Sequence, residues 1–318
     1  MKSLPMNELG REIYSLLSLF LTHMRQILVL YITFLCVSCN LLAQTKRALV
    51  IGLGEHKDPA WNKINGDKDV PYIIEILSDA KYEHIITCVN KEATKARIVS
   101  AFKILEKTCN PKDIVYVHFS GHGQQMSDRS KDETDEKDEC WITYDAYRRP
   151  SENYKGEKHL TDDEVNYYLN LIRNKIGDEG KMLVVIDACH SGTATREGND
   201  VEMTRGVSEI FETAITWIVD TIGNYSKVLF DNQIQQNSER WITISACKSS
   251  EVNVEMRKPS VGKLTYALYK MTKEKPSTNN REFFNNILNF VDSNSCSMPQ
   301  TPELSGDITR YSIIDILK

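Results

Sequence analysis

The sequence predicts an α/β fold in which a mostly parallel central sheet is flanked by helices on both faces, a three-layer αβα architecture. Short apolar runs rich in β-branched residues alternate with amphipathic helical patterns along the first half of the chain. Two of the predicted strands, 113–119 and 181–186, run into turns that carry glycine, serine, histidine and cysteine. Because ligands bind beyond the carboxyl ends of parallel strands, we expect the functional site at these turns.

The first predicted strand covers residues 47–54 and ends in glycines. No G-x-G-x-x-G pattern opens a helix there, which argues against a dinucleotide site. A helix is expected to begin at Asp67 or Asp69, because Pro71 is tolerated in a first turn and the apolar spacing that follows fits one buried face. The next elements are a strand over 85–89, a helix over 92–107 and the strand over 113–119.

The second half begins with a helix whose start is marked by a capping box of Thr161 and Glu164. This helix is predicted to end at Gly177, and the apolar strand over 181–186 follows. Residues 192–239 are the least regular part of the chain, with a helical pattern over 207–222. The last predicted elements are a strand over 241–247 and helices from residue 261 and over 281–290.

Composition excludes several classes of protein. The chain has 318 residues, which suits one large or two small domains. Its 41% hydrophobic and 26% charged residues are ordinary for a globular protein. A net charge of −5 gives no reason to expect a nucleic-acid partner. The eight cysteines follow neither metal-ligand nor disulfide-framework spacing.

Residues 1–45 are predicted to be a targeting segment. Met24, which is an alternative start, is followed by a basic residue and an apolar run over 27–37, the anatomy of a signal peptide and too short for a comfortable membrane span. Cleavage is expected near residues 43–44. The alternatives are a bacterial lipobox with a lipidated Cys39, or an uncleaved anchor. All three predict an exported protein: periplasmic, lipid-anchored at the outer membrane or cell surface, or secreted, without a stable membrane span in the mature form.

Cys189 and His122 are the candidate catalytic residues. Cys189 follows the strand over 181–186, and His122 stands between two glycines after the strand over 113–119. A thiol in such a place is usually a small buried hydrophobe, and a histidine beside glycines is usually a turn residue. Both together at strand ends favour a dyad in which the imidazole activates the thiol as nucleophile.

These residues also carry a family resemblance. The sequences His-Phe-Ser-Gly-His-Gly at 118–123 and Asp-Ala-Cys-His-Ser-Gly at 187–192, together with the acidic stretch over 128–139, resemble the signature of the caspase-like cysteine proteases, and most closely the metacaspases. The resemblance runs from about Lys46 to the C-terminus, with a break after Cys189. It implies one caspase-like catalytic domain over 46–318. This domain is divided into a large-subunit-like part (46–196), a connector (197–240) and a small-subunit-like part (241–318), with 300–304 and 311–317 as its last loop and strand.

The activity implied is that of a cysteine endopeptidase working through a thioester. Cys189 attacks the peptide carbonyl, His122 handles the proton, and the backbone N–H groups of Gly123 and Cys189 stabilise the oxyanion. No cofactor is required for this chemistry. The resemblance also implies a monomer, whose partners are peptide or protein substrates.

Four residues are predicted to bind the substrate residue before the scissile bond, called P1 below. Asp187 lies two residues before Cys189, so on a strand it faces the same side. The resemblance adds Asp69, Ser120 and Ser245. Two carboxylates in a partly desolvated pocket favour a P1 Arg or Lys. The alternatives are a helix N-terminal acid for Asp69 and a structural acid for Asp187.

The acidic stretch over 128–139 raises the question of calcium. Charge runs are usually solvated loops, but carboxylate oxygens also suit calcium. The resemblance implies Asp138, Asp162 and Asp163 as ligands, although the last two also have a helix-capping explanation. Arg196 stands where the family has a fourth acid. Calcium dependence is therefore left open.

The connector is a candidate for self-processing, because in this family it is often cut during activation. Arg196 and Arg205 are the candidate cleavage positions, with Lys227 and Arg240 as further basic residues. Two other classes of function stay open at this point. One is a catalytically silent caspase-like scaffold, which thiol labelling with a basic electrophile would exclude. The other is a calcium-responsive surface protein, which calcium titration of a Cys189→Ala chain would reveal.

Overall fold

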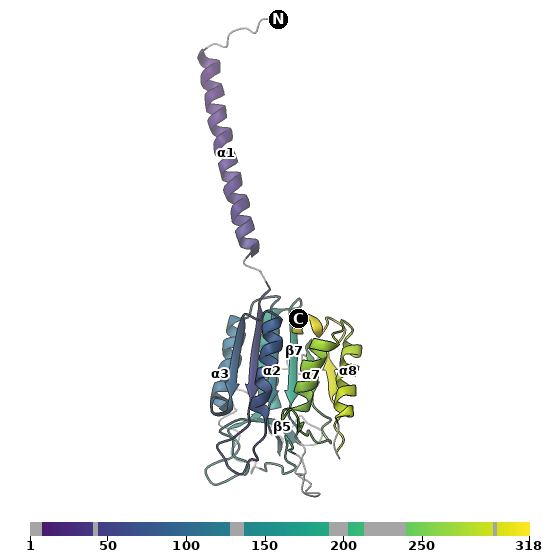
Figure 1. Cartoon of the computed structure of the whole chain (residues 1–318). Coiled ribbons are helices and arrows are strands. Elements are labelled where there is room, and N and C mark those ends of the chain that lie inside the picture. Colours follow the sequence, from purple (N-terminus) through teal and green to yellow (C-terminus); the bar gives the residue numbers. More distant parts are fainter. Residues whose placement is uncertain (1–7, 41–43, 128–136, 191–202, 213–239, 295–297) are drawn as a thin grey trace. The chain divides into compact units, whose positions relative to one another are not determined.

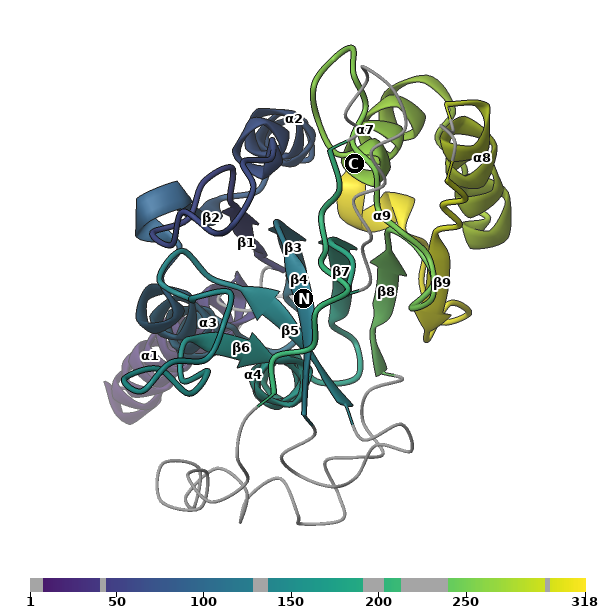
Figure 2. The ribbon, with the colours of Figure 1, turned by 90° about the horizontal axis from the view of Figure 1, so that it is seen from below.

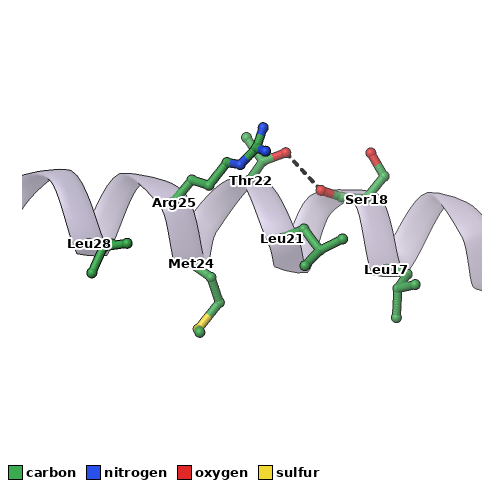
Figure 3. A pocket seen from close by; sticks show the side chains of 7 residues that line it. All are labelled: Leu17, Ser18, Leu21, Thr22, Met24, Arg25 and Leu28. Carbon is green, nitrogen blue, oxygen red and sulfur yellow. Dashed lines mark hydrogen bonds between the residues drawn. The ribbon is translucent and has the colours of Figure 1, made fainter.

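The computed structural model describes residues 8–40, 44–127, 137–190, 203–212, 240–294 and 298–318. The chain divides into two compact units, Met1–Gln44 and Thr45–Lys318. The first unit contains one helix, α1 (Glu8–Asn40). Across the described ranges, no helix is long and apolar enough to cross a membrane. Figure 3 shows a pocket on α1 lined by side chains such as Leu17, Leu21 and Leu28. None of the predicted catalytic residues belongs to it.

The second unit, whose helices and strands are drawn in Figure 1, is built on a six-stranded sheet with the order β2-β1-β3-β7-β8-β9. The first five strands of this order pair in parallel, and β9 pairs with β8 in the antiparallel direction. This mostly parallel sheet confirms the predicted fold class. Its strands are β1 (Lys46–Gly52), β2 (His84–Val89), β3 (Ile114–Ser120), β7 (Lys181–Asp187), β8 (Ile242–Ser245) and β9 (Glu303–Gly306).

Helices cover both faces of this sheet (Figure 2). Successive side chains of a strand point to opposite faces, so the apolar strands feed two separate cores. Val50 and Tyr116 pack into one core, whereas Leu49 and Val117 pack into the other. The helices on the first core are α2 (Gly66–Asp79), α7 (Lys263–Glu274), α8 (Asn280–Ser293) and α9 (Ile314–Leu317), and those on the second are α3 (Lys95–Thr108) and α4 (Asp162–Ile176).

A second, antiparallel sheet lies beyond the carboxyl ends of the main strands. It consists of β4 (Gly123–Ser127), β5 (Lys137–Ile142) and β6 (His159–Thr161). The acidic stretch predicted as a loop follows β4 and runs into β5, and the hairpin that these two strands form was not predicted. The Ile142 N–H donates to the carbonyl of His122 at 3.0 Å, so this sheet fixes the turn that carries the candidate catalytic histidine.

Capping residues set two of the helix starts. The predicted capping box is present, since the Glu164 N–H donates to Thr161 and the Thr161 N–H donates back to the Glu164 carboxylate. The helix predicted over 92–107 begins later, at Lys95, because Thr94 accepts a hydrogen bond from the Arg97 N–H. A short 3-10 turn (η1, Asn90–Glu92) precedes it.

Two predicted elements are wrong in the described residues. The helix predicted over 207–222 is absent from 207–212, which run extended beside β4, with the Phe211 N–H donating to the Gln125 carbonyl at 2.8 Å. The rest of that prediction lies outside the described residues. The closing segment 311–317 was expected to form the last strand, but it ends in α9, because its apolar residues pack as one helical turn onto the first core. The last strand is β9.

Asp113 offers a stability test at the start of β3. Its buried carboxylate accepts hydrogen bonds from Arg47 Nε at 2.8 Å and from the N–H groups of Thr45 and Asn110 at 3.0 Å. Asp113→Ala leaves the buried Arg47 charge unpaired, so we expect a loss of roughly 3–5 kcal/mol in the free energy of unfolding. Urea unfolding measures it. Asp178→Ala, which removes an exposed ion-pairing carboxylate, is the control, with an expected loss under about 1 kcal/mol. Equal losses would contradict the assignment.

Candidate active site

The candidate catalytic residues follow two neighbouring strands at one edge of the main sheet. Ser120, the last residue of β3, pairs with Asp187, the last residue of β7. His122 and Gly123 come directly after β3, and Cys189 comes directly after β7. The parallel register therefore brings both predicted turns to the carboxyl edge, as the sequence analysis expected.

The His122 ring is held in one orientation. Its Nε2 lies 2.8 Å from the carbonyl oxygen of Asn62, and the ring stacks on Trp61 with centroids 5.1 Å apart. A carbonyl can only accept, so Nε2 carries the proton and, in the neutral ring, Nδ1 keeps a lone pair. Nδ1 is buried and hydrogen-bonds to none of the described residues. Burial lowers the pKa of His122 to about 4, so at pH 7 the ring is a neutral base.

The Cys189 thiol is buried and donates to the carbonyl oxygen of Glu251 at 2.8 Å. Cys247 lies beside it, with its thiol 3.6 Å from the same carbonyl. The hydrogen bond to Cys189 and burial raise the pKa of Cys247, which therefore stays a thiol. After Cys189, His190 Nδ1 lies 3.1 Å from Glu139 Oε2 of β5, which ties this turn to the second sheet.

A buried acidic pocket at this edge holds the side chain of Arg205. Arg205 Nη1 lies 2.7 Å from Asp69 Oδ2 and 3.3 Å from Asp187 Oδ1. Its Nε and Nη2 both lie 2.9 Å from Glu255 Oε1. Ser120 accepts a hydrogen bond from Nη1 at 2.6 Å and donates to Asp69 at 2.5 Å. Three of the four predicted P1-pocket residues therefore meet around one guanidinium.

Neighbouring groups fix the two aspartates. Thr265 donates to Asp187 Oδ2 from its N–H at 2.8 Å and its hydroxyl at 2.7 Å, and the Asn253 amide donates to Oδ1 at 2.7 Å. The Gly262 N–H donates to Asp69 at 2.8 Å. A Cβ on Gly262 would fall 2.6 Å from an Asp69 oxygen and 2.5 Å from Arg205 Nη1, so only glycine leaves room for the guanidinium.

The charges in this pocket require a cation. Burial raises the pKa of Asp69 to about 6, although Arg205 opposes this shift. Burial acts in the same direction on Asp187, but the Arg205 charge and the hydrogen bonds from Thr265 and Asn253 outweigh it and lower its pKa. The Arg205 pKa is raised, because the three carboxylates outweigh desolvation of the guanidinium. Arg205 supplies the positive charge that balances these buried carboxylates.

The backbone of Arg205 lies in the same cleft. Its carbonyl oxygen accepts hydrogen bonds from the N–H groups of Gly123 and Cys189, both at 3.1 Å, the two donors predicted for the oxyanion. The Arg205 N–H donates to Asn253 at 2.9 Å, and Met203 accepts from Glu255 at 2.9 Å. Gly206 then forms a parallel bridge with Gly123. Residues 203–206 therefore lie as an extended peptide across the candidate catalytic residues.

The remaining predicted site residues are Ser245, Arg196 and the three aspartates predicted to bind calcium. Ser245 ends β8, and in the described part of the chain no hydrogen bond or ion pair joins it to Arg205. Arg196 lies outside the described residues. Asp138 is buried on β5, whereas Asp162 and Asp163 begin α4. No group of three potential metal-ligating side chains occurs within the described ranges, and residues 128–136 of the acidic stretch lie outside them, so calcium binding stays a prediction.

Several residues of the site escaped the sequence analysis. Glu255, the third carboxylate around Arg205, sits in an ordinary mixed segment whose only signal is an acid between apolar residues. Gly262, Asn253 and Thr265 give no signal, because their roles depend on contacts across the fold. The Asn62 contact uses a backbone carbonyl, which every residue has.

Comparisons with known proteins find similarity to metacaspases. Residues 46–196 match the sequence model of the metacaspase, peptidase C14 domain. Metacaspase-1B of Neosartorya fischeri is 35% identical over 159 residues, and Metacaspase-1B of Aspergillus fumigatus is 30% identical over 159 residues. Each match covers 47% of this chain and 36% of the relative, so the chain spans about a third of these relatives' length. The crystal structure of protein GSU0716 from Geobacter sulfurreducens shares the fold, with a TM-score of 0.56, 23% identity, and coverage of 84% of this chain and 97% of that one.

The fold and the residues at its sheet edge define a caspase-like α/β protein. The match over residues 46–196 shows that this part of the chain is similar to the metacaspase, peptidase C14 domain, and the curated relatives that it matches are metacaspases. The acidic pocket also uses residues beyond this match, since Arg205, Glu255 and Gly262 all lie after residue 196.

Proposed function

We propose that this chain is a cysteine endopeptidase that hydrolyses peptide bonds after Arg or Lys and cuts its own connector between Arg205 and Gly206. The observation that carries the proposal is the placement of Arg205. Its side chain fills the acidic pocket while its carbonyl oxygen accepts from the N–H groups of Gly123 and Cys189. A P1 residue poised for attack requires both features.

The reaction follows from this arrangement. Cys189 Sγ forms a bond to the P1 carbonyl carbon while His122 Nδ1 takes the thiol proton. The negative charge that develops on the carbonyl oxygen is stabilised by the two N–H groups. His122 then protonates the leaving amine as the C–N bond breaks, which leaves a thioester. Water, deprotonated by His122, hydrolyses the thioester and returns the free thiol.

A peptide assay tests the specificity. Full-length protein is incubated with fluorogenic peptides that are identical except for Arg, Lys or Asp at P1. We expect Arg to be cleaved best, Lys next, because Arg alone matches several carboxylates through a planar fork, and Asp not at all. Turnover of the Asp peptide as fast as the Arg peptide would overturn the proposal. The same assay with calcium and with a chelator measures any calcium dependence.

Mass spectrometry of the purified chain tests self-cleavage. We expect a fragment that begins at Gly206 and its absence from an Arg205→Gln chain, because a neutral amide leaves the pocket carboxylates uncompensated. Arg205→Lys should still be cut, more slowly. Arg281→Gln, which removes an exposed arginine of α8, is the control and should be cut like the unchanged chain. A fragment that begins elsewhere in the Arg205→Gln chain and the unchanged chain alike would contradict the position.

The pH dependence of kcat/KM should follow the ionisation of Asp69. The pKa of Asp69 is about 6 with Arg205 in place. Because the Arg205 charge lowers this pKa, the pKa of Asp69 is higher when the pocket holds no cation. Below this range Asp69 is neutral and attracts a P1 Arg less. We therefore expect kcat/KM for an Arg peptide to fall as the pH drops through 6. His122, with a pKa of about 4, stays neutral over this range. Asp69→Asn should lower the plateau and remove this fall, and a fall that persists in the variant would contradict the assignment.

A further inference from the structure

The chain beyond Gly206 lies in a built groove on the second sheet. Its backbone runs beside β4: Phe211 donates from its N–H to the Gln125 carbonyl at 2.8 Å and accepts from the Ser127 N–H at 3.3 Å. Parallel bridges join Gly206 to Gly123 and Phe211 to Met126. This segment is on the leaving side of the proposed scissile bond, and β4 begins with the residue that donates to the Arg205 carbonyl.

A buried polar network forms the middle of this groove. The Tyr154 hydroxyl lies 2.8 Å from His159 Nδ1, and His159 Nε2 lies 3.0 Å from Gln124 Oε1. The Gln124 amide nitrogen then donates to the backbone carbonyl of Glu209 at 2.9 Å. Gln124 and His159 are completely buried, so this donor is held in place. It binds a main-chain atom and therefore accepts any residue at that position.

Two side-chain contacts give the groove its selectivity. The Glu209 carboxylate lies 3.3 Å from Arg148 Nε and 2.9 Å from Arg149 Nε. The Phe211 ring is fully buried, packed edge to face on Tyr154 with centroids 5.7 Å apart and 4.5 Å from the His159 ring. The apolar walls of this pocket are Met126, Cys140, Ile142, Ala146 and Tyr154.

We propose that this groove is a leaving-side substrate subsite that takes an acidic side chain at the fourth residue and an aromatic side chain at the sixth residue after the scissile bond. Glu209 and Phe211 occupy these two positions after the Arg205–Gly206 bond. The inference rests on the proposed function for the position of that bond. It identifies the substrates as polypeptides with Arg or Lys at P1, an acidic residue four positions later and an aromatic residue two positions after the acid.

The subsite also explains how the connector is positioned before it is cut. The acidic pocket holds the chain on one side of the bond, and the aromatic pocket holds it on the other. When the peptide is anchored on both sides, the Arg205 carbonyl is held at the N–H groups of Gly123 and Cys189. This raises the effective concentration of that carbonyl at the nucleophile. A substrate in trans must displace the chain's own Phe211 to use the same pocket.

The test uses a full-length Phe211→Ala chain, in which the pocket is emptied. A dye-labelled heptapeptide with the sequence of residues 206–212 is compared with the same peptide carrying alanine in place of the phenylalanine. We expect about tenfold or more tighter binding of the phenylalanine peptide, because burial of a Phe ring contributes that much. The preference should shrink on the unchanged chain, whose own Phe211 fills the pocket. Equal binding of the two peptides to the Phe211→Ala chain, or no saturable binding of either, overturns the subsite.

A second variant covers the case in which Phe211→Ala fails to fold. The Arg149 side chain is 69% exposed, so Arg149→Ala leaves the core intact. Because the chain's own Glu209 occupies both arginines, the test uses a Glu209→Ala chain, which should prefer the heptapeptide with glutamate at its fourth position over one with glutamine about threefold. Adding Arg149→Ala should reduce this preference, and a preference that is absent from the Glu209→Ala chain, or the same in both chains, overturns the acidic part of the subsite.

Turnover separates this inference from the proposed function. Internally quenched peptides covering residues 203–212, with phenylalanine or alanine at position 211, are given to the Phe211→Ala chain. Cleavage of both at the same kcat/KM supports the endopeptidase and overturns the subsite. Heptapeptide discrimination without cleavage of any peptide supports the groove as a binding site and overturns the endopeptidase.

Discussion

Replacing Cys189 by alanine is expected to abolish both self-cleavage and hydrolysis of Arg peptides, with a loss of about 1,000-fold or more in kcat. The methyl group cannot attack a carbonyl, whereas the amides of Gly123 and residue 189 and the acidic pocket remain to bind the substrate. KM should therefore change far less than kcat. In the unchanged chain the nucleophile's residue already contacts the proposed scissile carbonyl, because the Cys189 N–H donates to the Arg205 carbonyl at 3.1 Å.

Cys247→Ala is the matched control, because both thiols are buried and lie against the Glu251 carbonyl. Cys247 makes no hydrogen bond to Arg205 among the described residues, so its loss should leave kcat within about threefold of the unchanged chain. Thermal unfolding of both variants separates lost chemistry from lost structure. An active Cys189→Ala chain together with an inactive Cys247→Ala chain would identify Cys247 as the nucleophile.

The sequence predicted most of the framework because its strands and helices are specified locally. The run over 181–186 is apolar throughout, as a strand buried on both faces must be, and it forms β7. The capping box at Thr161 and Glu164 marked the start of α4 to the residue. The alternation of side chains predicts that Asp187 faces the same side as Cys189, and in the structure its carboxylate lies 3.3 Å from Arg205 Nη1.

Other parts could not be predicted because they depend on distant contacts. The segment over 207–212 has the apolar spacing of a helix, but β4 offers it backbone partners, and Phe211 has a pocket there. Tertiary packing therefore overrides the local pattern. The closing segment 311–317 was predicted as a strand but ends in α9. Its apolar run is so short that the pattern fits a strand and one turn of helix equally well.

The acidic pocket, too, was predicted only in part from the sequence. Asp69 came from a helix start and Ser120 and Asp187 from motifs at strand ends. Glu255 joins them only because residues 253–255 pair with residues 203–205. Nothing local distinguishes this glutamate from an exposed one. Arg205 was one of several basic residues in the connector, and only the fold shows that three carboxylates surround it.

Gly262→Ala is expected to remove the preference for a basic P1 residue. A Cβ at this position would collide with oxygens of Asp69 and Asp187 and occupy the space of the guanidinium. We expect kcat/KM for an Arg peptide to fall by about 100-fold or more, since the buried carboxylates lose their cation partner. Self-cleavage after Arg205 should fall with it. The backbone strain is small, because Gly262 has φ −62°, which alanine adopts readily.

The decisive measurement is a ratio of substrates, because a ratio is insensitive to the fraction of folded enzyme. A peptide with alanine at P1 does not reach the carboxylates, so its slow turnover should be little changed by Gly262→Ala, and the Arg-to-Ala ratio should collapse. Ser260→Ala, two residues away, removes a surface hydrogen bond to the Arg257 carbonyl and should leave the ratio unchanged. If Gly262→Ala lowered the turnover of both peptides equally, residue 262 would support the fold and not the pocket, and the selectivity for Arg would need another origin.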